Sequence, residues 1–228
     1  MKSQIKIKLA LFNFILVSIF YVLGIMFKHT IIKIVATALI APSIGTFYFL
    51  SSNRNLTYEL ILIFSFIGSV LILSNEFLYS IAGIISFWGM ILLIADHILK
   101  EIKVPLIKQF KKKKIVLSFS IHMIYLIGIL FILHEDLGNF IYPIVFYGIT
   151  LLGASFLSTI LWEEEKNKTN LNLMIGVFML ILSGSLLAIK LFSENINPAQ
   201  DLFRLLFYIG FQYLTCQYFI KHNLKYKD

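Results

Sequence analysis

Residues Asn172–Phe192 have the sequence NLMIGVFMLILSGSLLAIKLF, and this stretch decides how the rest of the chain is interpreted. The hydrocarbon core of a bilayer is about 30 Å thick, and roughly 20 consecutive apolar residues cross it as a helix. The stretch meets that requirement. One edge of the helix differs from the rest, since it carries at helical spacing Asn172, Gly176, Met179, Ser183 and Lys190. Such an edge predicts a polar partner inside the membrane.

The composition of the 228-residue chain extends this pattern to its whole length. Hydrophobic residues make up 59% of the chain and charged residues 14%, and the mean hydropathy is +0.86, whereas soluble domains are about half apolar. No stretch between the apolar runs is long enough for a soluble domain. We therefore predict an all-α integral membrane bundle of eight transmembrane helices, with residues 1–228 as a single transmembrane domain. The expected spans are residues 5–27, 30–50, 56–74, 77–99, 115–133, 137–162, 170–192 and 198–220.

The basic residues predict the orientation of this bundle. If the N-terminus lies inside, 16 of the 20 Lys and Arg residues fall on the inner side, so the positive-inside rule places both termini in the cytoplasm. The longest connection is a basic loop, residues 100–114, in which apolar residues alternate with lysines. That composition is typical of a segment at the membrane surface. We expect anionic lipid headgroups to contact its last four lysines, Lys111, Lys112, Lys113 and Lys114.

The formal net charge of +8 is explained by these lysines at helix ends, so nucleic acid is not expected as a partner. We expect the protein in the inner, or cell, membrane of a bacterium, with membrane lipids as its partners. The single cysteine, Cys216, excludes an intrachain disulfide. His122 is interpreted as a packing residue, and no second His or Cys stands at metal-ligand spacing from it. We therefore predict no metal site and no cofactor.

Polar and small residues mark the helix faces that pack together or line a cavity, because helices in a membrane gain no hydrophobic free energy from associating. The last expected span carries the longest such face, composed of Asp201, Arg204, Tyr208, Gln212 and Thr215. Asp201 and Arg204 are three residues apart near the outer interface and are interpreted as a local ion pair. Tyr208 and Gln212 fit either helix packing or the wall of a polar cavity, because a buried amide needs several hydrogen-bond partners.

Three short segments resemble those of the YhhN-like membrane proteins, which include the lysoplasmalogenases. Phe64–Leu73 (FSFIGSVLIL) is similar to the family's F-S-x-x-G-D-x-x-L segment. Ser183–Phe192 (SGSLLAIKLF) is similar to its S-D-x-L-L-A-x-x-x-F segment, and Tyr208–Gln212 (YIGFQ) to its Tyr-x-x-x-Gln segment. The resemblance covers most of the chain and implies eight spans with both ends in the cytoplasm.

The resemblance also implies an activity, the hydrolysis of the vinyl-ether bond of lysoplasmalogens. That reaction needs an acid to protonate the vinyl carbon and a base to position water, and paired carboxylates suit both roles. The family's two aspartates correspond here to Ser69 and Gly184, and its histidine in the fourth span corresponds to Ile91. We therefore identify no catalytic residue. The candidate pocket-lining residues implied by the resemblance are Ser65, Ser69, Ser183, Tyr208 and Gln212.

The sequence leaves three functions open. The first is a lysoplasmalogenase-like ether hydrolase whose catalytic groups have moved, with His122 or Glu76 taking part. The second is a non-catalytic protein on the same scaffold that binds a lipid, such as a lysophospholipid, or has a structural role. The third is a small transporter lined by the polar faces. It would need a continuous polar path across the membrane.

Overall fold

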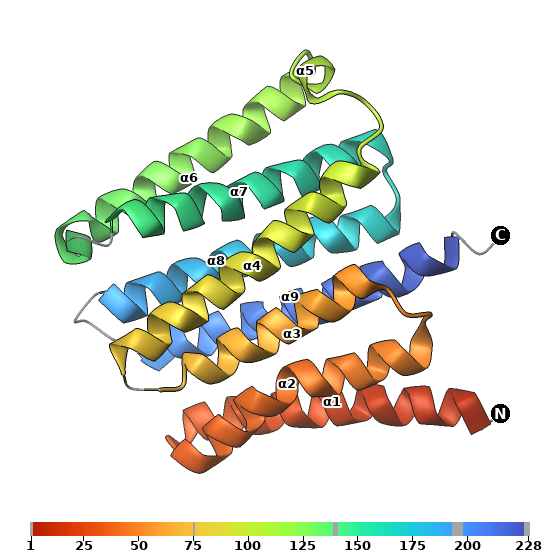
Figure 1. Ribbon diagram of the computed structural model, residues 1–228, viewed down its shortest axis with the longest axis vertical. Helices are drawn as coiled ribbons and strands as arrows, with labels where there is room; N and C mark the ends of the chain where they lie inside the picture. Colours follow the sequence, from red (N-terminus) through yellow and green to blue (C-terminus); the bar gives the residue numbers. More distant parts are fainter. Residues whose placement is uncertain (1, 75, 139–140, 193–197, 226–228) are drawn as a thin grey trace.

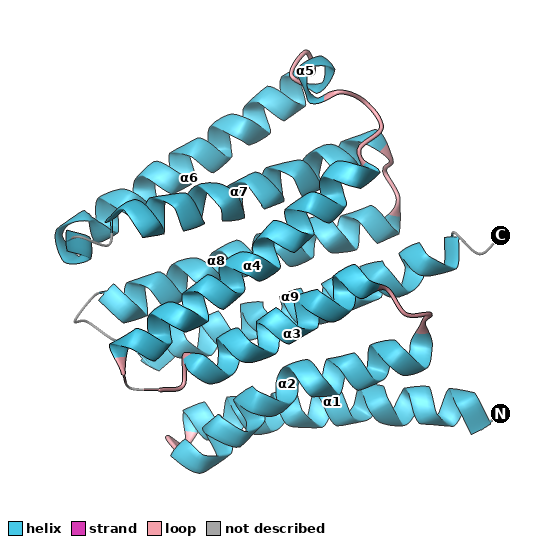
Figure 2. Ribbon diagram, viewed as in Figure 1, coloured by secondary structure: helices cyan, strands magenta, loops and turns pink. Residues whose placement is uncertain are grey.

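The computed structural model describes residues 2–74, 76–138, 141–192 and 198–225. These residues form nine helices and no strand (Figures 1 and 2). The helices are α1 (Lys2–Met26), α2 (Thr30–Ser51), α3 (Leu56–Leu71), α4 (Phe77–Glu101), α5 (Leu106–Gln109), α6 (Lys113–Leu137), α7 (Ile141–Glu164), α8 (Lys168–Phe192) and α9 (Pro198–Lys225). Each of the eight expected spans overlaps one of the long helices, and α5 is a single turn inside the basic loop.

Six of these helices are long and apolar enough to cross a membrane, namely α1, α2, α4, α6, α7 and α8. The other two long helices differ for separate reasons. α3 has 16 residues and is therefore about 24 Å long, shorter than the hydrocarbon core. α9 has 28 residues, but charged residues such as Asp201 and Lys221 near its two ends make it less apolar than the six. The apolar helices indicate a membrane-embedded protein.

Several helix ends differ from the expected spans. α3 ends at Leu71 and not at Ser74, because the next backbone bonds reach back only three residues, from Leu73 N to Val70 O at 3.1 Å. α6 continues to Leu137, so the following helix begins at Ile141 and not at residue 137. Gly138 ends α6 with a φ of 47°, a left-handed conformation that glycine adopts without strain.

The basic loop, predicted as a segment at the membrane surface, is shorter than residues 100–114 and is attached to α7. Its expected ends belong to α4 and α6. Glu164 at the end of α7 accepts hydrogen bonds from the backbone N–H groups of Lys103 (3.1 Å) and Val104 (3.0 Å) and from the side chain of Gln109. Gln109 is fully buried. One carboxylate therefore holds the segment between α4 and α6 against the bundle.

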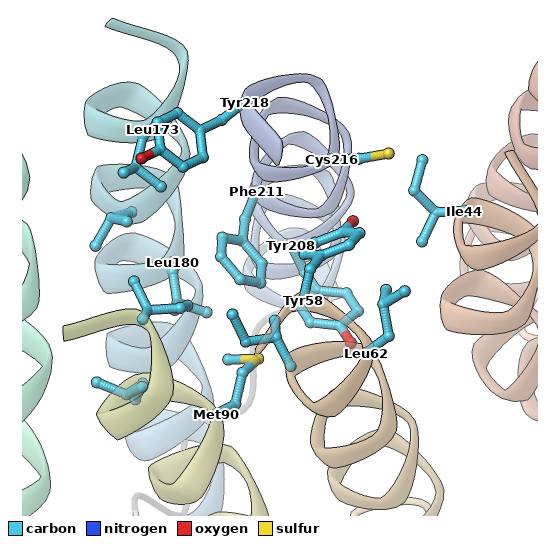
Figure 3. Packing of buried hydrophobic residues seen from close by; sticks show 14 of the residues in the cluster. Ile44, Tyr58, Leu62, Met90, Leu173, Leu180, Tyr208, Phe211, Cys216 and Tyr218 are labelled. Carbon is cyan, nitrogen blue, oxygen red and sulfur yellow. The ribbon is translucent and has the colours of Figure 1, made fainter. Parts of the chain in front are cut away.

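The long helices lie side by side in an elongated array, with α6 at one margin and α1 at the other (Figure 1). The two sides of the array at which the helices begin and end are here its two ends. The N- and C-terminal ends of the chain and the α5 segment lie at the same one. α9 occupies the interior, where it packs most extensively against α8 and also contacts α1 and α2. In Figure 3, Tyr218 of α9 lies against Leu173 of α8. Cys216 points the other way, towards Ile44 of α2, and is fully buried.

The small residues on α3 allow it to approach α4 closely. A Cβ atom added at Gly83 would lie 2.7 Å from the Ile72 side chain and 3.1 Å from the Gly68 carbonyl oxygen. Only glycine fits there, so the backbones of α3 and α4 meet closely at this point. The outer face of α6 is the opposite case, because Ile124 and Phe131 are 70% and 75% exposed. Apolar exposure on this scale is suited to lipid.

Candidate functional site

A cavity of about 550 Å³ lies among the helices, at the end of the array opposite the termini. Its wall combines residues of α1, α2, α3, α4, α7, α8 and α9 with the link between α3 and α4. Apolar side chains such as Phe87, Leu180 and Leu187 form part of the wall, and hydroxyl groups and cations form the rest. This volume is within the usual range of small-molecule binding pockets.

Three of the five candidate pocket-lining residues stand on this wall, namely Ser69, Ser183 and Tyr208. The other two, Ser65 and Gln212, are not among the lining residues. Both are buried, and both belong to the hydrogen-bond network behind Tyr208. The structure therefore brings four of the five together around one tyrosine, while Ser183 shares only the cavity with them.

The Tyr208 hydroxyl is the centre of this network. It lies 2.6 Å from Ser65 Oγ and 2.8 Å from Ser69 Oγ, so it is hydrogen-bonded to both serine hydroxyl groups. Gln212, one turn further along α9, donates from Nε2 to Ser65 Oγ. All four side chains are buried. Each such bond contributes about 1 kcal/mol net, and together they fix the register of α3 against α9.

A cluster of charged side chains at the end of the array opposite the termini joins three helices. Asp201 of α9 contacts Lys33 of α2 at 3.5 Å, Lys190 of α8 at 2.6 Å and Arg204 of α9 at 3.3 Å. The three cations line the cavity. Three positive groups around one carboxylate leave a formal surplus of two positive charges. An anion entering the cavity therefore meets a favourable potential there.

The sequence indicated only part of this cluster. It pairs Asp201 with Arg204, which are neighbours on one helix face, but not with Lys33 or Lys190. Lys190 does lie on the polar edge of Asn172–Phe192. The missing information was that the ends of α2, α8 and α9 meet.

A sequence profile of the YhhN family matches residues 31–222, which is most of the chain. The chain belongs to the YhhN family. No curated protein and no solved structure matches it. Ser69 and Gly184, the two positions at which the resemblance implies aspartates, both line this one cavity.

The backbone of Gly184 approaches α7 closely, but not so closely that it excludes a Cβ atom. A Cβ atom added there would lie 3.2 Å from Leu151 Cδ2 and 3.5 Å from the Tyr147 hydroxyl, so only a small shift of Leu151 is needed. No Asp or Glu is found among the residues that line the cavity in the described part of the chain. The wall offers hydroxyl groups and cations, which bind and orient a ligand but do not supply a carboxylate acid–base pair.

The other residues considered for catalysis lie elsewhere. His122 on α6 has both ring nitrogens engaged, with the Ser118 carbonyl oxygen at 2.8 Å and with Ser155 Oγ at 3.0 Å, which matches its interpretation as a packing residue. Glu76 is exposed at the start of α4 and is not among the cavity-lining residues. Ile91 is fully buried in the core.

A second group of titratable side chains was not expected from the sequence. His97 and Glu101 on α4 meet His222 on α9, with potential ligand atoms all within 4.8 Å of one another. A metal site is recognised from sequence when its ligands stand at a typical spacing within one segment. These three residues come from two separate helices, so that signal is missing. The available signal was the pair His97 and Glu101, four residues apart, together with a histidine at the same end of the last helix.

Replacing Tyr208 with Phe tests the network. The change removes one hydroxyl and leaves two buried serines without their partner, so we expect a loss of about 1–3 kcal/mol in the free energy of unfolding. Thermal unfolding of the purified protein in detergent measures it. Tyr79→Phe, at an exposed tyrosine of α4, is the matched control. Equal stabilities for the two variants would contradict the assigned role of Tyr208.

Proposed function

We propose that this YhhN-family protein binds a single-chain phospholipid in the cavity and does not hydrolyse it by the route of the lysoplasmalogenases. The observation that carries the proposal is the composition of the cavity wall. It combines apolar side chains with a cationic end and has no carboxylate among its described lining residues. Such a wall complements an amphiphile that carries a phosphate.

The cationic end supports the assignment of the headgroup. Lys190 and Arg204 lie on neighbouring helices, and both already engage the oxygens of the Asp201 carboxylate. A phosphate oxygen accepts the same charge-assisted hydrogen bonds, and arginine suits phosphate because its donors form a planar fork. The acyl chain would lie against Phe87, Leu180 and Leu187.

The absence of an acid–base pair among the described lining residues favours binding over hydrolysis. Protonation of a vinyl carbon needs an acid that gives up its proton near neutral pH. A serine hydroxyl is too weak an acid for this, and Gly184 has no side chain. The hydrolase alternative would have to use His122 or Glu76, and neither is among the cavity-lining residues.

The transporter alternative is the least supported. It needs a polar path that continues beyond Tyr208 to the other end of the array. In that direction the side chains are aromatic, with the Tyr58 ring 4.6 Å from the Phe219 ring and 4.5 Å from the Tyr48 ring, centre to centre. Tyr58 and Phe219 are almost fully buried.

We also infer that all eight long helices cross the membrane, with both termini in the cytoplasm. α3 and α9 would cross as helices whose buried groups Ser65, Tyr208 and Gln212 are hydrogen-bonded to one another within the protein. The segment Leu205–Ile220 of α9 has no charged residue and is flanked by Arg204 and Lys221. Long basic side chains at helix ends reach the interface and so extend a short span.

Lipid binding tests the first proposal directly. A lysophospholipid and a monoacylglycerol of the same chain length are titrated separately into the protein in nanodiscs, and bound lipid is measured by native mass spectrometry. We expect the phosphate-bearing lipid to bind at least tenfold more tightly, since charge-assisted hydrogen bonds contribute about 1.5–3 kcal/mol each. Lys190→Gln and Arg204→Gln should each remove about tenfold of that preference. Lys28→Gln, at the same end of the array but off the cavity, should not. Equal affinity for the two lipids would contradict the proposal.

Aldehyde release separates binding from hydrolysis. With a lysoplasmalogen in proteoliposomes, we expect no aldehyde from the native protein above a lipid-only control. The double variant Ser69→Asp and Gly184→Asp places two carboxylates on the cavity wall, so measurable release is expected from it. Lysophospholipid binding by the double variant serves as the control for folding. Turnover by the native protein would overturn the non-catalytic assignment, and an inert but lipid-binding double variant would contradict the acid–base roles of these two positions.

Labelling with a membrane-impermeant maleimide tests the orientation. The native Cys216 is buried, so single cysteines are introduced as Lys28→Cys and Lys112→Cys, at opposite ends of the array. In intact bacterial spheroplasts we expect Lys28→Cys to react, and Lys112→Cys to react only after permeabilisation. The reverse pattern would show that the termini are outside.

A further inference from the structure

A compact group of metal-ligand side chains lies far from the cavity on the same helices. His97 and Glu101 are one turn apart on α4, and His222 approaches them from α9. His97 is ten residues beyond the cavity-lining Phe87, about 15 Å along the helix axis. The group is therefore at the end of the array that holds the termini, where the orientation proposed above places the cytoplasm.

We propose that His97, Glu101 and His222 bind a divalent transition-metal ion of the Zn²⁺ type. Two imidazoles and a carboxylate are ligands that zinc prefers, and a His₂Glu set leaves a fourth tetrahedral position open. The potential ligand atoms lie within 4.8 Å of one another. His222 Nε2 and Glu101 Oε2 contact each other at 2.9 Å, so two candidate ligand atoms already lie side by side.

The ring geometry agrees with this assignment. Two imidazoles that share a tetrahedral zinc ion at Zn–N distances of about 2.0 Å have ring centres about 5 Å apart. The rings of His97 and His222 are 5.2 Å apart between centres, with 73° between their planes. They are therefore not stacked, and in-plane lone pairs of the two rings can converge on one point.

A supporting hydrogen bond positions His97. Its Nε2 lies 3.0 Å from the Tyr218 hydroxyl oxygen, and the ring is buried. Metal-binding histidines commonly donate their second ring N–H to an oxygen, which fixes the tautomer and the orientation of the ring. If Nε2–H donates here, the other ring nitrogen keeps its lone pair for a metal ion. Tyr218 is then a positioning residue.

A small cavity gives access to the group. It has a volume of about 60 Å³, and its lining includes Glu101 and His222 together with two further carboxylates, Glu164 and Glu165, and one cation, Lys103. Since a water molecule occupies about 30 Å³ in the liquid, this space is large enough for a water ligand at the open position. The carboxylates also favour entry of a cation over an anion. Nothing in this arrangement depends on the proposed lipid site.

Metal binding by the full-length protein tests the proposal. The affinity tag is removed, because a histidine tag would bind the same ion, and the chelator-treated protein in detergent is titrated with Zn²⁺ against a chromogenic competitor. We expect one tightly bound ion per chain. His222→Asn and Glu101→Gln should each weaken binding at least tenfold, and His29→Asn, at an exposed histidine of the opposite end, should not. Equal binding by the native protein and both site variants would overturn the proposal, as would the absence of binding by the native protein.

Cobalt substitution gives a second measurement that does not need the variants to be stable. Co²⁺ in a four- or five-coordinate site with nitrogen and oxygen ligands has visible absorption bands far stronger than those of hexa-aqua Co²⁺. We expect these bands to reach saturation at one equivalent and to disappear on adding Zn²⁺. A weak spectrum of the octahedral type would contradict the assigned ligand set.

Discussion

Inside a bilayer a polar side chain must find its hydrogen-bond partner within the protein. The Tyr208 hydroxyl of α9 finds its partners on α3, and the same bonds satisfy the buried polar side chains of α3. Its two serine partners come from α3, and Gln212 of α9 supports one of them. The bonds hold α3 and α9 in a single register. That register in turn places Ser69 and Arg204 on the wall of the same cavity.

The position of the helices was predictable from the sequence, whereas their exact ends were only partly so. Apolar runs of bilayer length are a strong signal, because almost no other arrangement satisfies the backbone in lipid. Helix ends depend on single residues, such as Gly138, whose positive φ ends α6 after Leu137. The burial of Gln109 against Glu164 had no signal in a segment whose composition is that of a surface loop.

The candidate site, too, was only partly predictable from the sequence. Ser69, Ser183 and Tyr208 were found because each lies on a polar face of one helix or within a family segment. The contact between Lys33 and Asp201 was not, because it joins residues 168 positions apart, and periodicity along one helix does not identify which helix ends meet. The proximity of His222 to His97 was not predicted for the same reason. Contacts between side chains of one helix can be predicted from their spacing in the sequence. Contacts between side chains of different helices can be identified only once the fold is known.

The exposure of α6 has a consequence for how the protein responds to its membrane. The apolar stretch of α6, Ile115–Leu133, has 19 residues and is about 28 Å long, close to the thickness of a typical hydrocarbon core. Only 11% of its most apolar window is buried inside the protein. Since few protein contacts restrain it, α6 is the long helix freest to change its tilt when the bilayer becomes thinner or thicker than this stretch. Bilayer thickness therefore acts first on α6, and reaches the interior helices only through α7 and α8, the helices that α6 contacts.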